Sequence, residues 1–99
     1  MKITKSAEGS VLKIAVSGRL DTATAPELES VLKDSLAGVS ELLLDIHELE
    51  YISSAGLRVL LTAQKTMNAQ NGTMRVAGAN EMIREIFEVT GFIDILTLE

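Results

Sequence analysis

The chain has 99 residues, a formal net charge of -5 and no cysteine. This length suits one domain with a single core, and the lack of cysteine excludes a disulfide framework, thiolate metal sites and cysteine nucleophiles. Basic residues are scattered and no apolar run is long enough to span a membrane, so we expect no nucleic-acid partner and no membrane segment. The first ten residues lack a signal-peptide pattern, which favours a cytoplasmic protein.

The first half of the chain predicts two strands followed by a helix. Residues 2–6 are a candidate edge strand, and in residues 11–17 apolar side chains alternate as a strand requires. Thr24 is expected to cap a helix, with Pro26 in its first turn and Glu27 completing a capping box. The apolar residues of this helix recur at helical spacing: Leu28, Val31, Leu32 and Leu36.

The second half alternates strands and helices. Residues 42–46 form a nearly continuous apolar run, typical of a central strand covered on both faces, and a polar loop is predicted over residues 47–50. The remaining predicted elements are a helix from Ser54 to about Ala69, a strand over residues 73–77, a helix that Asn80 caps, and a candidate last strand over residues 92–98. This order predicts an α/β domain with a mixed four- to five-stranded sheet and helices packed against it.

The sequence offers little for catalysis. His47 is the only histidine, and a loop histidine without a chemical role is favoured over a general base. The nearest acids, Asp45, Glu48 and Glu50, do not repeat at a metal-ligand spacing, and neither a glycine-rich phosphate loop nor a G-x-S-x-G elbow occurs. We therefore expect no catalytic residue, no metal and no cofactor.

The most informative feature is a pair of serines at the junction between a strand and a helix. A serine at a helix start can cap a free backbone N–H group, worth about 1 kcal/mol, and this explanation is favoured for Ser53. Ser54 precedes Ala55 and Gly56, two small residues that would let another molecule approach closely. A helix start also tolerates an anion, so a phosphate of about -1.5 to -2 charge on Ser54 would act on a partner surface.

The segment YISSAGLR, residues 51–58, closely resembles the signature of STAS-domain anti-sigma factor antagonists. Three further segments agree with this resemblance: Gly18–Asp21, Arg75–Asn80 and Phe87–Phe92. Because the resemblance extends over essentially the whole chain, residues 1–99 are expected to form one STAS-like domain.

The resemblance implies a partner-switching cycle in which the chain itself is not an enzyme. In this family the dephosphorylated antagonist binds an anti-sigma factor that is also a serine kinase, and so releases a sigma factor. The kinase then phosphorylates the antagonist from ATP, and a metal-dependent serine phosphatase reverses the reaction. The motif places the acceptor at Ser54, with Ser53 second because many members carry Asp there. The partner-binding residues expected near the acceptor are Asp21, Thr22, Ser53, Gly56 and Arg58.

Several alternatives stay open at this point. Asp21 is equally well explained as a turn-forming residue ahead of a helix, and Arg58 as a solvated side chain. A STAS-type accessory subunit of a transporter, for example in lipid trafficking, would use the same helix face without turnover of phosphate. A small nucleotide-binding protein is disfavoured because the phosphate loop is missing. A monomer is the default expectation.

Overall fold

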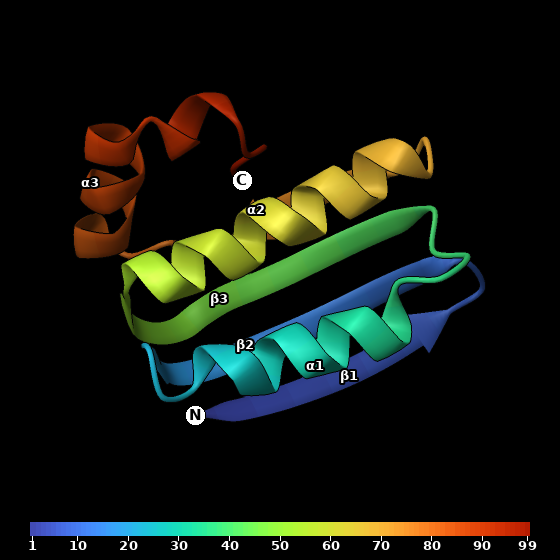
Figure 1. The fold of residues 1–99 in the computed structure, drawn as a ribbon, viewed down its shortest axis with the longest axis horizontal. Coiled ribbons are helices and arrows are strands. Elements are labelled where there is room, and N and C mark those ends of the chain that lie inside the picture. The colour runs from blue at the N-terminus through green and yellow to red at the C-terminus, as the bar shows by residue number, and fades with distance from the viewer.

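The computed structural model, which describes residues 1–99, contains one four-stranded sheet and three α-helices (Figure 1). The strands, in their spatial order, are β1 (Lys2–Glu8), β2 (Val11–Leu20), β3 (Glu41–Ile52) and β4 (Thr73–Ala77). The helices are α1 (Ala25–Ser35), α2 (Ser54–Ala69) and α3 (Glu81–Thr90), followed by a 3-10 helix η1 (Phe92–Asp94). None of these helices is long and apolar enough to cross a membrane.

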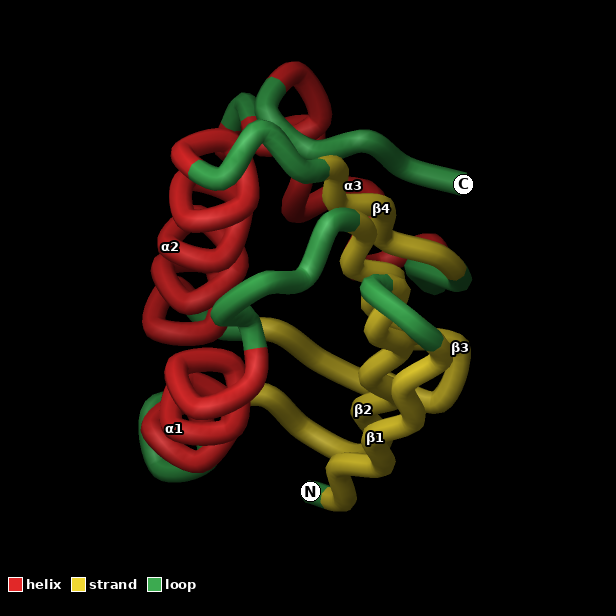
Figure 2. The backbone as a smooth tube through the Cα atoms, turned by 90° about the vertical axis from the view of Figure 1, so that its right-hand side faces the viewer, coloured by secondary structure: helices red, strands yellow, loops and turns green.

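The sheet is mixed, as the order of elements predicted. β1 pairs antiparallel with β2, whereas β2 with β3 and β3 with β4 are parallel pairs joined by crossover helices. Helices α1 and α2 lie side by side on one face of the sheet (Figure 2). The core beneath them comprises 23 buried hydrophobic residues, of which Phe87 alone is aromatic. The fold is therefore stabilised mainly by aliphatic side chains.

The two central strands are longer than predicted. β2 continues to Leu20 instead of ending at residue 17, and β3 runs through residues 47–50, where a polar loop was predicted. The pairing register shifts between Ala15 and Ser17, so that an extra residue of β3 is accommodated opposite β2. Because of this bulge, both His47 and Glu48 are exposed, and the next residue, Leu49, is buried in the core. The strand therefore continues through these polar residues.

The two ends of the helical layer also differ from expectation. Thr24 precedes α1 but makes no side-chain bond to the helix, so the predicted capping box with Glu27 is wrong. Its hydroxyl instead donates to the Arg19 carbonyl oxygen at 2.7 Å. After α3, residues 92–98 form η1 and a single bridge between Leu98 and β4, not a complete fifth strand.

Asn80 caps α3 as predicted and also ties this helix to β3. Its Oδ1 accepts from the Ile83 backbone N–H at 2.8 Å, and its Nδ2 donates to the Leu49 carbonyl oxygen at 3.2 Å.

Replacing Asn80 with Ala removes both bonds, and we expect the free energy of unfolding to fall by about 1–2 kcal/mol in urea titrations. Asn80→Ser keeps a capping oxygen and loses only the bond to Leu49, so the free energy of unfolding should fall less than in Asn80→Ala. Equal losses in the two variants would contradict this assignment.

Candidate functional site

The candidate site is built where β2 and β3 end side by side. Their parallel pairing extends to Leu20 opposite Ile52, and the Ser53 backbone N–H then donates to the Leu20 carbonyl oxygen at 2.8 Å. The chain segments that follow, 21–24 before α1 and 53–54 before α2, are therefore neighbours. The starts of α1 and α2 lie at the same end of the molecule in Figure 1. In α/β proteins this carboxyl edge of parallel strands is where binding surfaces are usually found.

The two serines of the motif have different environments. Ser53 is the N-cap of α2: its extended backbone precedes the helix and its half-buried Oγ accepts from the Gly56 backbone N–H at 3.3 Å. This confirms the capping role expected for Ser53. Ser54 is the first residue of the helix, and its side chain is exposed and engaged in no hydrogen bond within the chain. An exposed hydroxyl at a helix start is accessible to an enzyme that modifies it.

Gly56 does not lie on the surface, and the interpretation of this residue as clearance for a partner is corrected. Gly56 is buried, and a Cβ atom there would lie 2.8 Å from both Ile52 Cγ1 and Leu20 Cγ. A side chain at this position would therefore collide with the ends of the two strands that α2 covers. The glycine is required so that the first turn of α2 can pack onto Leu20 and Ile52.

Asp21 holds the turn before α1. Its Oδ1 accepts from the backbone N–H groups of Ala23 at 3.0 Å and Thr24 at 3.1 Å. The Thr24 backbone N–H is the main cause that holds the pKa of Asp21 below its ordinary value of 3.8, so the carboxylate is ionised. These bonds show that Asp21 forms the turn. Its other carboxylate oxygen, Oδ2, lies 4.0 Å from Arg19 Nε at the surface.

Thr22 and Arg58, which are distant in sequence, line one shallow hollow of about 160 Å³ between the starts of α1 and α2. Both side chains are exposed, and Arg58 forms no ion pair within the chain. The other residues around this hollow are Ala25, Pro26, Glu29, Ala55 and Val59. Of the five residues expected at the partner surface, four are accessible at this end of the molecule and Gly56 is not.

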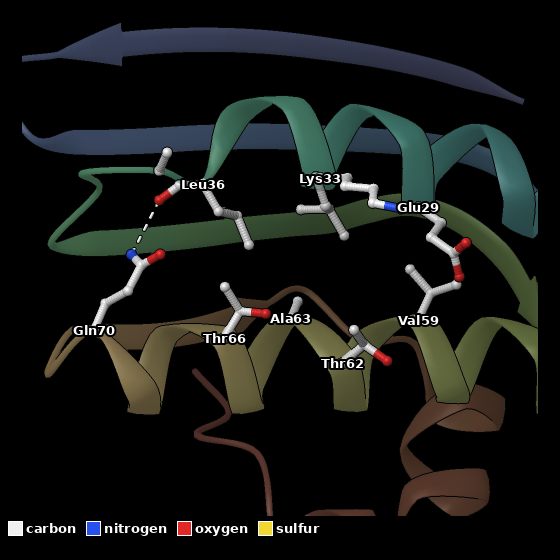
Figure 3. A pocket seen from close by; sticks show the side chains of 10 residues that line it. Glu29, Lys33, Leu36, Val59, Thr62, Ala63, Thr66 and Gln70 are labelled. Carbon is white, nitrogen blue, oxygen red and sulfur yellow. Dashed lines mark hydrogen bonds between the residues drawn. The ribbon is translucent and has the colours of Figure 1, made fainter.

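A larger groove of about 490 Å³ continues from the hollow along α1 and α2 (Figure 3). The two depressions share Glu29 and Val59. At the far end Gln70 closes the groove, because its Nε2 donates to the carbonyl oxygens of Leu36 at 3.0 Å and Val39 at 3.1 Å. Aliphatic and threonine side chains make up much of the lining, and the chain has no group of three His, Cys, Asp or Glu residues placed to hold a metal ion. This surface offers shape for docking rather than acid–base chemistry.

Arg19 and Tyr51 border the junction; both lie in segments that carry the family resemblance, but the sequence assigned neither a role. They are partners in the register of β2 and β3, and the Arg19 guanidinium carbon lies 4.5 Å from the centre of the Tyr51 ring. Such a cation–π contact at an exposed site is worth about 0.5–1 kcal/mol. A second register shift, between Gly18 and Arg19, brings the two residues together, and because it is a tertiary feature the spacing of the sequence gave no signal for it.

His47 lies in β3 and not in a loop. Its Nδ1 is 2.5 Å from Asp45 Oδ1, and its ring packs against Gly78, where a Cβ atom would collide with it. The hydrogen bond from the His47 ring, followed by the one from its backbone N–H, holds the pKa of Asp45 below its ordinary value of 3.8. The surrounding hollow is lined by Lys2, Thr4, Ala15, Val16, Ser17, Asp45, His47 and Glu48. It contains neither of the two serines of the motif.

Comparisons with known proteins show the family and the fold of the chain. Residues 2–99 match the family model of the STAS domain. A Bordetella bronchiseptica protein described as a candidate anti-sigma factor antagonist, BtrV, is 34% identical over 96 residues, which are 96% of this chain and 83% of that protein. A candidate anti-sigma factor antagonist from Thermotoga maritima has the same fold, with a TM-score of 0.90 at 17% identity over 97% of this chain and 84% of that one.

The phosphorylated form of the Bacillus cell fate determinant SpoIIAA also shares the fold. Its TM-score is 0.78 at 14% identity, over 99% of this chain and 91% of that one. The STAS-like α/β fold predicted from the serine motif and its neighbouring segments is thereby confirmed.

The packing of Gly56 gives a test of how the junction is built. We expect Gly56→Ala to lower the free energy of unfolding by about 1–2 kcal/mol, because the overpacking cost exceeds the gain of about 1 kcal/mol in helix propensity. In a Leu20→Ala background only the close contact with Ile52 Cγ1 remains, so the cost of Gly56→Ala should be smaller than in the wild-type background. A double-mutant cycle of urea unfolding measures this coupling. Strictly additive losses would contradict a contact between position 56 and Leu20.

Proposed function

Because the chain belongs to the STAS domain family, we propose that it is an anti-sigma factor antagonist whose partner binding is switched off by phosphorylation of Ser54. The observation that carries this proposal is the exposed, unbonded side chain of Ser54 at the first position of α2, beside a capping Ser53. The 34% identity over nearly the whole chain to a relative described as such an antagonist supports the same function. The chain would act by binding, and not as an enzyme.

We expect phosphorylation at Ser54 to lower the stability of the fold less than phosphorylation at Ser53. The Ser53 oxygen already accepts the Gly56 N–H and is half-buried, so a phosphate there would disturb the cap. A phosphate on Ser54 would lie at the positive end of the α2 dipole, close to the free N–H groups of the first turn. The acceptor is therefore assigned to Ser54, with Ser53 second.

Arg58 provides a way for the phosphate to change the surface. Ser54 and Arg58 are four residues apart on α2, which places them on the same side of the helix. Arg58 forms no ion pair in the unmodified chain, so it is free to contact a partner. A phosphate one turn away would attract its guanidinium and would also repel acidic groups of the partner.

The proposed partner surface comprises Asp21, Thr22, Ser53 and Arg58 around the acceptor. We assign this surface to an anti-sigma factor that is also the serine kinase, with a serine phosphatase restoring the unmodified state. A monomer in the cytoplasm, without contact to nucleic acid or membrane, completes the proposal. No feature of the site favours an accessory role in a transporter.

Incubation with the cognate anti-sigma kinase and ATP tests the acceptor. Mass spectrometry should locate one phosphate on Ser54 of the wild-type chain. The Ser54→Ala variant should carry no phosphate, and the Ser53→Ala variant should still be phosphorylated. Phosphate found elsewhere on the wild-type chain would overturn the assignment of the site.

The same partner then tests the switch by titration calorimetry. Ser54→Asp should weaken binding at least about tenfold, whereas the neutral Ser54→Asn, which has nearly the same shape, should bind like the wild type. Equal affinities of the Asp and Asn variants would show that charge at position 54 is not what controls the partner.

A further inference from the structure

Helix α3 and the residues after it carry most of the exposed large hydrophobic side chains of the molecule. There are four such side chains, and three of them lie between residues 82 and 95: Met82 at 48%, Val89 at 79% and Ile95 at 46%. The core contacts of α3 are made by other residues, chiefly the buried Ile83 and Phe87. Two of these three, Met82 and Val89, lie on α3 itself, and exposed apolar side chains that gather in one region indicate a surface with a partner.

The apolar residues of α3 that are not buried in the core form a stripe of their own. Met82, Ile86 and Val89 follow one another at intervals of four and three, which places them on one side of the helix. Ile86 is half-buried, at the border between this stripe and the core-facing side. The apolar arc of α3 is therefore wider than its contact with the sheet requires. We refer to Met82, Ile86 and Val89 as the α3 stripe.

Acidic side chains border the α3 stripe on its solvent side. At 100° per residue, Glu85 lies next to Val89 and Met82 around the helix, with Glu81 and Glu88 immediately beyond. All three glutamates are exposed, and none forms an ion pair within the chain. An apolar stripe with a row of unpaired carboxylates along one edge is complementary to an apolar ridge with a row of cations.

We propose that the α3 stripe docks a basic amphipathic helical segment of a protein partner, with its apolar ridge on Met82, Ile86 and Val89 and its lysines or arginines along Glu81, Glu85 and Glu88. An anionic lipid surface is disfavoured as the occupant, because the glutamates would face its headgroups. A second copy is disfavoured because each chain carries the same acidic row and a net charge of -5.

This inference does not depend on the phosphorylation switch. Figure 1 shows α3 toward the same end of the molecule as the start of α2, but the α3 stripe belongs to a different helix and contains none of the residues assigned to the Ser54 surface. The two surfaces can therefore be tested separately.

The probe is a fluorescein-labelled synthetic peptide of about four helical turns, with leucines at helical spacing beside a row of lysines. Fluorescence anisotropy against the full chain should show salt-sensitive binding that Val89→Ser and Met82→Gln each weaken at least about tenfold. Glu85→Gln should weaken binding less and reduce its dependence on salt. Val11→Ser is the matched control, because Val11 is an exposed valine (39%) on β2, and it should bind like the wild type.

Three outcomes would overturn the proposal. A scrambled peptide of the same composition that binds equally well would show that net charge alone is responsible. An equal loss of peptide affinity in Val11→Ser and Val89→Ser would show that the peptide does not bind at the α3 stripe. Dimerisation of the chain in sedimentation equilibrium, or binding to phosphatidylglycerol vesicles, that Val89→Ser abolishes would assign the α3 stripe to a second copy or to a membrane instead.

Discussion

One backbone hydrogen bond, from the Ser53 N–H group to the Leu20 carbonyl oxygen, joins the two places where strands become helices. It follows directly on the pairing of Leu20 with Ile52, which comes after two shifts in the register of β2 and β3. Because both strands are parallel and central, α1 and α2 must begin beside each other and cover the same face of the sheet. Everything that the site presents to a partner follows from this: the Asp21 turn, the hollow of Thr22 and Arg58, and the free hydroxyl of Ser54.

The tight packing under the first turn of α2 holds Ser54, the proposed acceptor, at the surface of the helix start. Gly56 lets the helix approach Leu20 and Ile52, while the Ser53 side chain caps the backbone at the same turn. These contacts occupy the inner side of the turn. Ser54 lies on the outer side, so it can be modified without loss of core packing. A phosphate on Ser54, as proposed, would change the surface charge and the environment of Arg58 and leave the core packing in place. Such a modification suits a regulator that has to bind and release a partner repeatedly.

Local patterns in the sequence predicted much of this molecule, and the failures share a cause. The alternation in residues 11–17, the apolar run at 42–46 and the caps at Ser53 and Asn80 depend on near neighbours, so they could be predicted. The extension of β3 through His47 and Glu48 depends on a bulge opposite β2, and Thr24 bonds to Arg19 instead of capping its helix. Gly56 was correctly singled out but for the wrong reason, because the residues that require it, Leu20 and Ile52, become its neighbours only in the folded chain.

The most direct measurement of this account is amide hydrogen exchange at the two serines in the unmodified protein. The Ser53 amide should exchange as slowly as the protected amides of β2 and β3, because it is bonded to Leu20. The Ser54 amide, in the first turn of α2 and without an intrahelical acceptor, should exchange rapidly. Exchange at Ser53 that is as fast as at Ser54 would mean that the two junctions are not held together, and the arrangement of the site derived from that contact would be wrong.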